Sequence, residues 1–203
     1  MNALAALVSC AAGLFLQTFT PDVGAPLSGH QLVDNERVTV SQLNGFQDPH
    51  PSPDFDMVEI VYARNQGAAF FIPKATKIVA SSSFRPQGTV QIVLKNHAVA
   101  PLPNTTGYPN AFPRPGIKKL IENDRVIVWD YTWMPNAPTP MHFHDKDVVV
   151  VYLDDGALQS TTPDGKKVVN RYSYGFTKFN PRDRTHTELL VEGHQHAIMM
   201  ELK

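Results

Sequence analysis

Hydrophobic residues in this chain occur in short runs that alternate with polar residues, and turn residues separate the runs. Residues 125–133 (RVIVWDYTW) are rich in β-branched and aromatic side chains, and the Val-rich run 147–153 ends at an Asp-Asp-Gly turn signal. Further runs at 167–174, 186–191 and 197–202 follow, with a Glu-Gly pair between the last two. Short strands at this spacing predict an all-β sandwich or barrel.

Two parts of the chain resemble each other. Residues 32–40 (LVDNERVTV) and 120–128 (LIENDRVIV) are identical at five of nine positions, and three more positions exchange Val with Ile or Asp with Glu. Self-similarity at a long period indicates duplicated supersecondary units. The sequence therefore predicts two tandem repeats at 30–99 and 118–203, separated by a Pro-rich linker at 100–117.

The start of the chain is apolar and uncharged from residue 3 to residue 19. This pattern resembles a secretory signal, so we expect residues 1–25 to be a signal peptide and the protein to be periplasmic or secreted. A buried first strand or helix is the alternative. Cys10 follows Leu-Val-Ser as in a bacterial lipobox, so lipoprotein anchoring is a second alternative. The run is too short to predict a membrane span for the rest of the protein.

Composition narrows the classes of function. The 17 prolines and 12 glycines favour turns over long helices. The 18 Lys and Arg residues and 19 Asp and Glu residues nearly balance, so no strong field favours binding to nucleic acid or an anionic membrane. Cys10 is the only cysteine, so a chain without its signal would have no disulfide.

Three of the eight histidines have a spacing that suits a metal site. His142 and His144 enter a predicted strand two residues apart, so both imidazoles lie on one face. His186 belongs to a later predicted strand and would meet them inside a barrel. Neutral imidazole binds Fe, Mn, Cu, Ni and Zn, and the alternative is a surface or hydrogen-bonded core pair. His194 and His196 also form a His-x-His pair, but they lie beside a predicted turn, where we expect solvent exposure.

These histidines lie in two segments that resemble the two motifs of the cupin superfamily. The positions of the first motif are occupied by Asn136, His142, His144, Val149 and Gly156. The positions of the second motif are occupied by Gly175, Pro181, Asp183, His186 and Leu190. Asn136 stands in place of Gly, which is tolerable where a left-handed backbone is needed. The resemblance covers most of the second repeat and implies a cupin-type β-barrel, or jelly roll.

One departure from the family pattern affects the charge of the site. Val149 stands where the family usually has a glutamate ligand, so three neutral imidazoles would leave the ion more open positions and its full charge. Asp147 is a candidate additional ligand, although it lies two residues early. Glu188 follows His186 by two residues on the same face, and we assign it as an acid/base or supporting group.

The first repeat lacks the histidines. Its counterpart of His-Phe-His is Asp54-Phe55-Asp56, and no histidine corresponds to His186. We therefore expect a degenerate first repeat that holds no transition metal and helps to shape the site of the second.

The resemblance implies a metal-dependent enzyme, with an iron-using oxygenase of a small organic molecule as the leading class. Iron is the expected metal, and Zn, Mn, Ni and Cu are alternatives. Tyr152, Arg184 and Glu188 are candidate substrate contacts, with Glu188 and Tyr152 as candidate catalytic groups. A non-catalytic periplasmic binding or sensor protein and a metal-independent isomerase are alternative functions. The expected partner is a small molecule, and a homo-oligomer is a further expectation.

Overall fold

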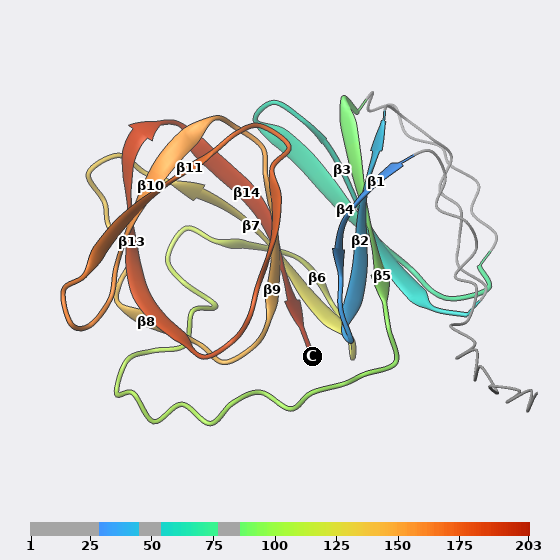
Figure 1. Ribbon diagram of the computed structural model, residues 1–203, viewed down its shortest axis with the longest axis horizontal. Coiled ribbons are helices and arrows are strands. Elements are labelled where there is room, and N and C mark those ends of the chain that lie inside the picture. The colour runs from blue at the N-terminus through green and yellow to red at the C-terminus, as the bar shows by residue number, and fades with distance from the viewer. Residues whose placement is uncertain (1–28, 45–53, 77–85) are drawn as a thin grey trace, which may run out of the picture.

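The computed structural model describes residues 29–44, 54–76 and 86–203, and the regular structure in these residues consists of β-strands (Figure 1). The all-β fold predicted from the sequence is confirmed. Within the described ranges there is no helix of the length and apolar character needed to cross a membrane. The apolar segment 3–19 and its predicted signal peptide lie outside the described residues.

The described residues before the predicted linker at 100–117, which we call the first segment, form one antiparallel sheet; the residues after it are the second segment. The strands of the first segment are β1 (Gly29–Asp34), β2 (Val38–Asn44), β3 (Asp56–Ala63), β4 (Gln66–Ile72) and β5 (Gly88–Leu94). They lie in the order β1-β2-β5-β3-β4. The described residues of this segment make no second sheet, so they do not by themselves enclose a barrel.

The second segment forms a barrel from two antiparallel sheets (Figure 1). Its strands are β6 (Lys118–Glu122), β7 (Val126–Trp133), β8 (His142–His144), β9 (Val148–Tyr152), β10 (Gly156–Thr161), β11 (Lys167–Tyr172), β12 (Thr177–Asn180), β13 (Arg184–Gly193) and β14 (Gln195–Leu202). One sheet has the order β11-β10-β13-β8, and the other has the order β12-β9-β14-β7-β6. Each run predicted in the second segment forms a strand. Strands β8, β10 and β12 complete the two sheets.

Two hydrophobic cores follow from the alternation of side chains along these strands. One core lies between the five-stranded sheets, with buried residues from β2, β3 and β5 against residues from β7, β9 and β14. The other core fills the barrel. Strand β14 serves both, because Ile198 and Met200 face the first core while Ala197 and Met199 face the second. The sheet that contains β14 is therefore buried on both faces.

The two five-stranded sheets correspond strand by strand, β1-β2-β5-β3-β4 with β6-β7-β14-β9-β12. Their first hairpins turn in the same way. The side-chain oxygen of Asn35 accepts from the backbone N–H groups of Arg37 and Val38 at 2.8 and 2.9 Å. The Asn123 oxygen accepts from Arg125 and Val126 at 2.8 and 3.0 Å. The two hairpins therefore turn alike, and the two-repeat interpretation of the whole chain stays a prediction.

The arginines of these two hairpins cross between the segments. Arg37 of the first segment pairs with Asp147, which lies between β8 and β9, at 2.6 Å. Arg125 of the second segment pairs with Asp56 of the first at 2.8 Å. Each arginine also donates to a backbone carbonyl of the opposite segment, at Lys203 and Lys95 respectively. The segments are therefore joined by a reciprocal pair of ion pairs.

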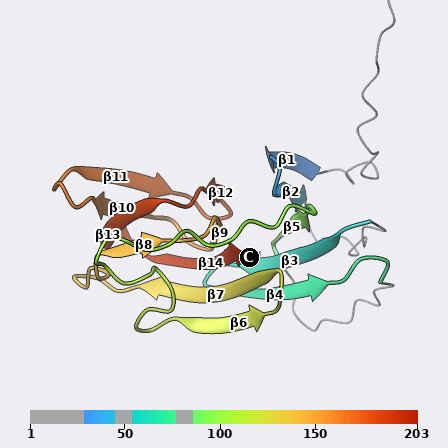
Figure 2. The same ribbon diagram turned by 90° about the horizontal axis from the view of Figure 1, so that it is seen from below.

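The segment predicted as a linker follows the barrel closely. It runs along one side of the molecule below the barrel (Figures 1 and 2). The N–H of Ala111 donates to the carbonyl of Phe143 at 2.8 Å, and the N–H of Phe143 donates to Pro109 at 2.9 Å. Asn110 makes a parallel bridge with Phe143 in the middle of β8. This segment therefore supports β8, a strand of only three residues.

Candidate metal centre

The three predicted histidines come from two neighbouring strands. His142 and His144 lie at the two ends of β8, and both point into the barrel because side chains alternate along a strand. His186 lies on β13 directly opposite His142 in the antiparallel pair. The register thus places all three imidazoles on the same inner face.

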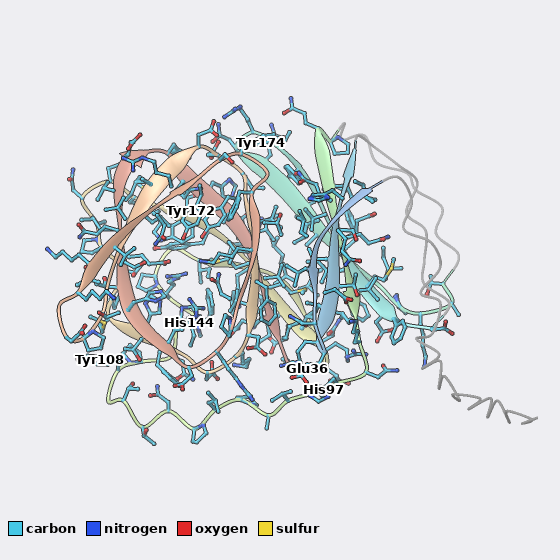
Figure 3. All side chains as sticks on the ribbon, in the orientation of Figure 1. Glu36, His97, Tyr108, His144, Tyr172 and Tyr174 are labelled. Carbon is cyan, nitrogen blue, oxygen red and sulfur yellow. The ribbon has the colours of Figure 1, made fainter. Side chains whose placement is uncertain are left out.

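The three rings form a nearly equilateral group. Their centroids are 5.0 Å apart for His142 and His144, 4.9 Å for His142 and His186, and 5.0 Å for His144 and His186. One nitrogen from each ring lies within 4.8 Å of the others. Figure 3 shows His144 inside the outline of the barrel. This spacing suits three nitrogens around one ion.

Buried nitrogens without partners line this group. His142 Nε2, both ring nitrogens of His144 and His186 Nε2 are buried and accept or donate no hydrogen bond. The Nδ1 of His142 lies 2.8 Å from the carbonyl oxygen of Pro140, so it carries the proton and leaves Nε2 as the electron-pair donor. Each ring therefore offers a nitrogen to an ion, and the donor set fits a transition metal.

Burial also keeps the imidazoles neutral. It lowers the pKa of His142 to about 4, and the nearby Arg114 acts in the same direction. Burial is the main cause that holds the pKa of His144 well below its ordinary value, and the charge of Arg184 adds to it. The pKa of His186 is lowered by burial as well. Neutral imidazoles near pH 7 need lose no proton before they bind a metal ion.

Glu188 lies beside the imidazoles, as its position two residues after His186 predicted. Its Oε1 is 3.7 Å from His186 Nε2. Its Oε2 accepts from Arg114 Nη1 at 3.2 Å and from Trp133 Nε1 at 3.1 Å. Burial opposes ionisation of this carboxyl, but the charge of Arg114 and the hydrogen bond from Trp133 hold the pKa of Glu188 below its ordinary value. A largely buried carboxylate therefore lies beside His186, at the edge of the imidazole group.

Arg114 was not predicted as a site residue. It lies in the segment assigned as a Pro-rich linker, and no local pattern marks it as part of the barrel. The structure buries it against Phe112, Tyr131 and Trp133, whose ring centroids lie 4.9, 4.4 and 5.7 Å from the guanidinium carbon. An arginine stacked on aromatic rings and paired with a carboxylate is held in one orientation. Arg114 thereby holds Glu188.

A small cavity of about 20 Å³ lies beside the imidazoles. Its lining residues are Arg114, Trp133, His144, Val148, Val150, Tyr152, Asn180, Arg184, Glu188 and Met199. Tyr152 stacks on Tyr172 with centroids 4.0 Å apart. Burial is the main cause that raises the pKa of Tyr152 well above its ordinary value, and the nearby Tyr172 adds to it. The phenol of Tyr152 therefore stays protonated. The predicted contacts Tyr152, Arg184 and Glu188 thus share one cavity wall.

Asp147 is not part of the imidazole group. Its Oδ2 accepts from Arg37 at 2.6 Å, and its Oδ1 accepts from the backbone N–H of Arg182 at 2.8 Å. Both oxygens are held in these contacts, so this geometry gives no support to Asp147 as an additional ligand.

The other His-x-His pair divides between surface and interior. The side chain of His194 is 57% exposed, as expected. The expected exposure of His196 is wrong, because its side chain is buried and its Nε2 lies 2.6 Å from Asp130 Oδ1. Strand β14 places His196 on the face that packs against the first segment, whereas His194 precedes the strand.

Two antiparallel sheets, closed around three imidazoles that two spaced motifs supply, define a cupin-type β-barrel. The described residues of the second segment therefore have the cupin-type β-barrel fold that the motifs predicted. No protein-family model matches the sequence.

Over 62 residues the chain is 39% identical to the β-alanine degradation protein BauB of Pseudomonas aeruginosa. The match covers 30% of this chain and 61% of BauB, so the chain spans about three fifths of the length of this relative.

Three solved structures are similar to parts of the chain. A cupin domain from Bordetella pertussis Tohama I is 28% identical, with 46% of this chain and 99% of that chain covered and a TM-score of 0.41. A cupin 2 conserved barrel domain protein from Leptotrichia buccalis is 13% identical over 86% of this chain and 88% of that one, with a TM-score of 0.48. The polyketide cyclase RemF from Streptomyces resistomycificus is 22% identical over 51% and 80%, with a TM-score of 0.37.

Proposed function

We propose that this protein binds one divalent transition metal ion, foremost iron, through His142, His144 and His186, and that it oxidises a small organic molecule with O₂. The observation that supports a metal is the group of buried ring nitrogens without hydrogen-bond partners. Buried polar atoms without partners cost free energy, and a metal ion would satisfy one on each ring. Zn, Mn, Ni and Cu accept the same donors.

The three imidazoles would hold the ion from the side of β8 and β13, and the cavity side would stay open to small molecules. Iron bound there would supply a Lewis-acidic centre that also changes its oxidation state. The barrel walls at Trp133, Val148 and Val150 exclude water from the surroundings of the substrate.

Glu188 is the proposed proton acceptor. Arg114 and Trp133 hold one of its oxygens, and the other oxygen lies toward His186. A fixed, ionised carboxylate in the barrel is placed to take a proton from a substrate in the cavity and to return it. The protonated phenol of Tyr152 on the same wall is placed to donate a hydrogen bond.

The similarity to BauB supports a small substrate, since that protein is named for degradation of an amino acid with a three-carbon chain. The main alternative is a binding or sensor protein that holds a small molecule without turnover. Both functions use the same cavity, so only turnover separates them.

O₂ consumption by the iron-loaded full chain tests the enzymatic part of the proposal. With a panel of small amino and carboxylic acids, we expect consumption that His186→Ala abolishes. Glu188→Gln should keep the iron but lower turnover by about 100-fold, within the range for loss of a general base. Iron uptake without O₂ consumption for any panel member would favour the binding protein. Unchanged turnover in Glu188→Gln would remove that residue from the chemistry.

A further inference from the structure

Arg184 points into the barrel beside the imidazoles. It precedes His186 by two residues on β13 and lies opposite His144 of β8, so its side chain is on the inner face. Its Nε donates to the carbonyl oxygen of Pro181 at 2.6 Å, which fixes the plane of the guanidinium. Among the described residues, its two terminal nitrogens have no hydrogen-bond or ion-pair partner.

The charges around the cavity do not cancel. Arg114 and Glu188 neutralise each other in an ion pair of 3.2 Å. Arg184 lines the same cavity with no carboxylate in contact, so one positive charge remains on the wall. The uncharged imidazoles leave it unbalanced, and a bound divalent ion would add two further positive charges. Such a partly buried cation is stabilised by an anion that supplies hydrogen-bond acceptors.

We propose that the cavity takes a small carboxylate, whose carboxylate group lies on the guanidinium of Arg184 while the rest of the molecule lies beside the three imidazoles. This inference rests on the proposed function and names its substrate class. The planar guanidinium matches the two oxygens of a carboxylate. The cavity is small, so it limits the ligand to a short chain.

Propionate and its neutral counterpart propionamide are the matched probes. Binding of each to the cobalt-loaded and the metal-free full chain is measured by calorimetry at constant ionic strength. We expect propionate to bind at least 10-fold more tightly than propionamide, because only propionate compensates the charge of Arg184. Equal affinities of the two probes for the wild-type protein would overturn the inference.

Variants of Arg184 locate the effect. Arg184→Leu should weaken propionate binding by about 10- to 100-fold and weaken propionamide binding much less. Arg184→Lys keeps the positive charge but lacks the planar guanidinium. Its affinity for propionate should therefore lie between those of the wild type and Arg184→Leu. The control is Arg171→Leu, since the side chain of Arg171 is exposed and pairs with Glu192 at the surface. Propionate affinity that is unchanged in a folded Arg184→Leu protein would overturn the inference.

The two forms of the protein separate this inference from the proposed function. If cobalt is not taken up, the proposed metal site fails, while propionate binding to the metal-free chain that depends on Arg184 still supports the anion site. If cobalt is taken up but propionate and propionamide bind alike, the metal site stands and the substrate class is wrong.

Discussion

The residues that replace glycine in the two motifs show how local conformation places the site. Asn136 and Asp183 have φ angles of 58° and 66°, and Gly175 has a φ of 78°. Asn and Asp tolerate this left-handed conformation better than other side chains do, which explains why Asn136 can stand in place of Gly and why Asp183 suits its position in the second motif. The N–H of Asp183 donates to the carbonyl of His144 at 2.9 Å. The turn before β13 is thereby joined to the strand that carries two of the imidazoles.

A carboxyl in the first segment predicts a pH dependence of stability. Glu59 is buried in β3 with no partner for its Oε1, and burial raises the pKa of Glu59 to about 7. The folded protein therefore holds this proton more tightly than the unfolded chain, so the carboxyl destabilises the fold progressively as pH rises from about 4.5 to about 7.

Replacing this carboxyl by an amide removes the dependence. The free energy of unfolding of Glu59→Gln, relative to that of the wild type, should be about 3 kcal/mol higher at pH 8 than at pH 4.5, because only the wild type loses stability over this range. Urea unfolding of both proteins at the two pH values measures this difference. An equal difference at both values would show that Glu59 ionises as easily in the folded protein as in the unfolded chain.

Among the elements of the fold, the site depends on β8, a very short strand that neighbouring segments hold in place. β8 has three residues, yet it carries two imidazoles. It pairs with β13 on one side, and the segment around Asn110 lies along it. The hairpin of β1 and β2 adds a third connection, because Arg37 pairs with Asp147, which lies between β8 and β9.

The two crossed arginines predict unequal losses of stability. Arg37 and Asp147 have side chains only 6% and 11% exposed, whereas those of Arg125 and Asp56 are 30% and 20% exposed. Arg37→Met would leave a buried carboxylate without its cation, which should cost about 3 to 5 kcal/mol. Arg125→Met should cost about 1 kcal/mol.

Urea unfolding of the two variants measures these losses. Adding Asp147→Asn to Arg37→Met should recover part of the stability, because no charge then remains unpaired. Equal losses in Arg37→Met and Arg125→Met would show that the depth of the Arg37 pair has no influence.

For the whole molecule, the features that could be predicted from the sequence are those that depend on the local alternation of side chains and on the spacing of motifs. The all-β fold, the barrel of the second segment and the approach of His142, His144 and His186 follow from period-two patterns and the register of neighbouring strands. The path of residues 100–117 did not follow, because a Pro-rich segment has no periodicity that reports what it packs against. Arg114 was missed for that reason. The interior position of His196 depends on which sheet covers β14, and that contact is equally absent from local sequence.

Metal content tests the central claim most directly. The full-length protein, made without an affinity tag and reconstituted with ferrous iron, should hold one ion per chain by elemental analysis. His142→Ala, His144→Ala and His186→Ala should each lose nearly all of it, because two imidazoles no longer enclose the ion. The matched control is His194→Ala, since this histidine is exposed and lies outside the group; it should keep full content. Full metal content in the three site variants, or none in the wild type, would contradict the account.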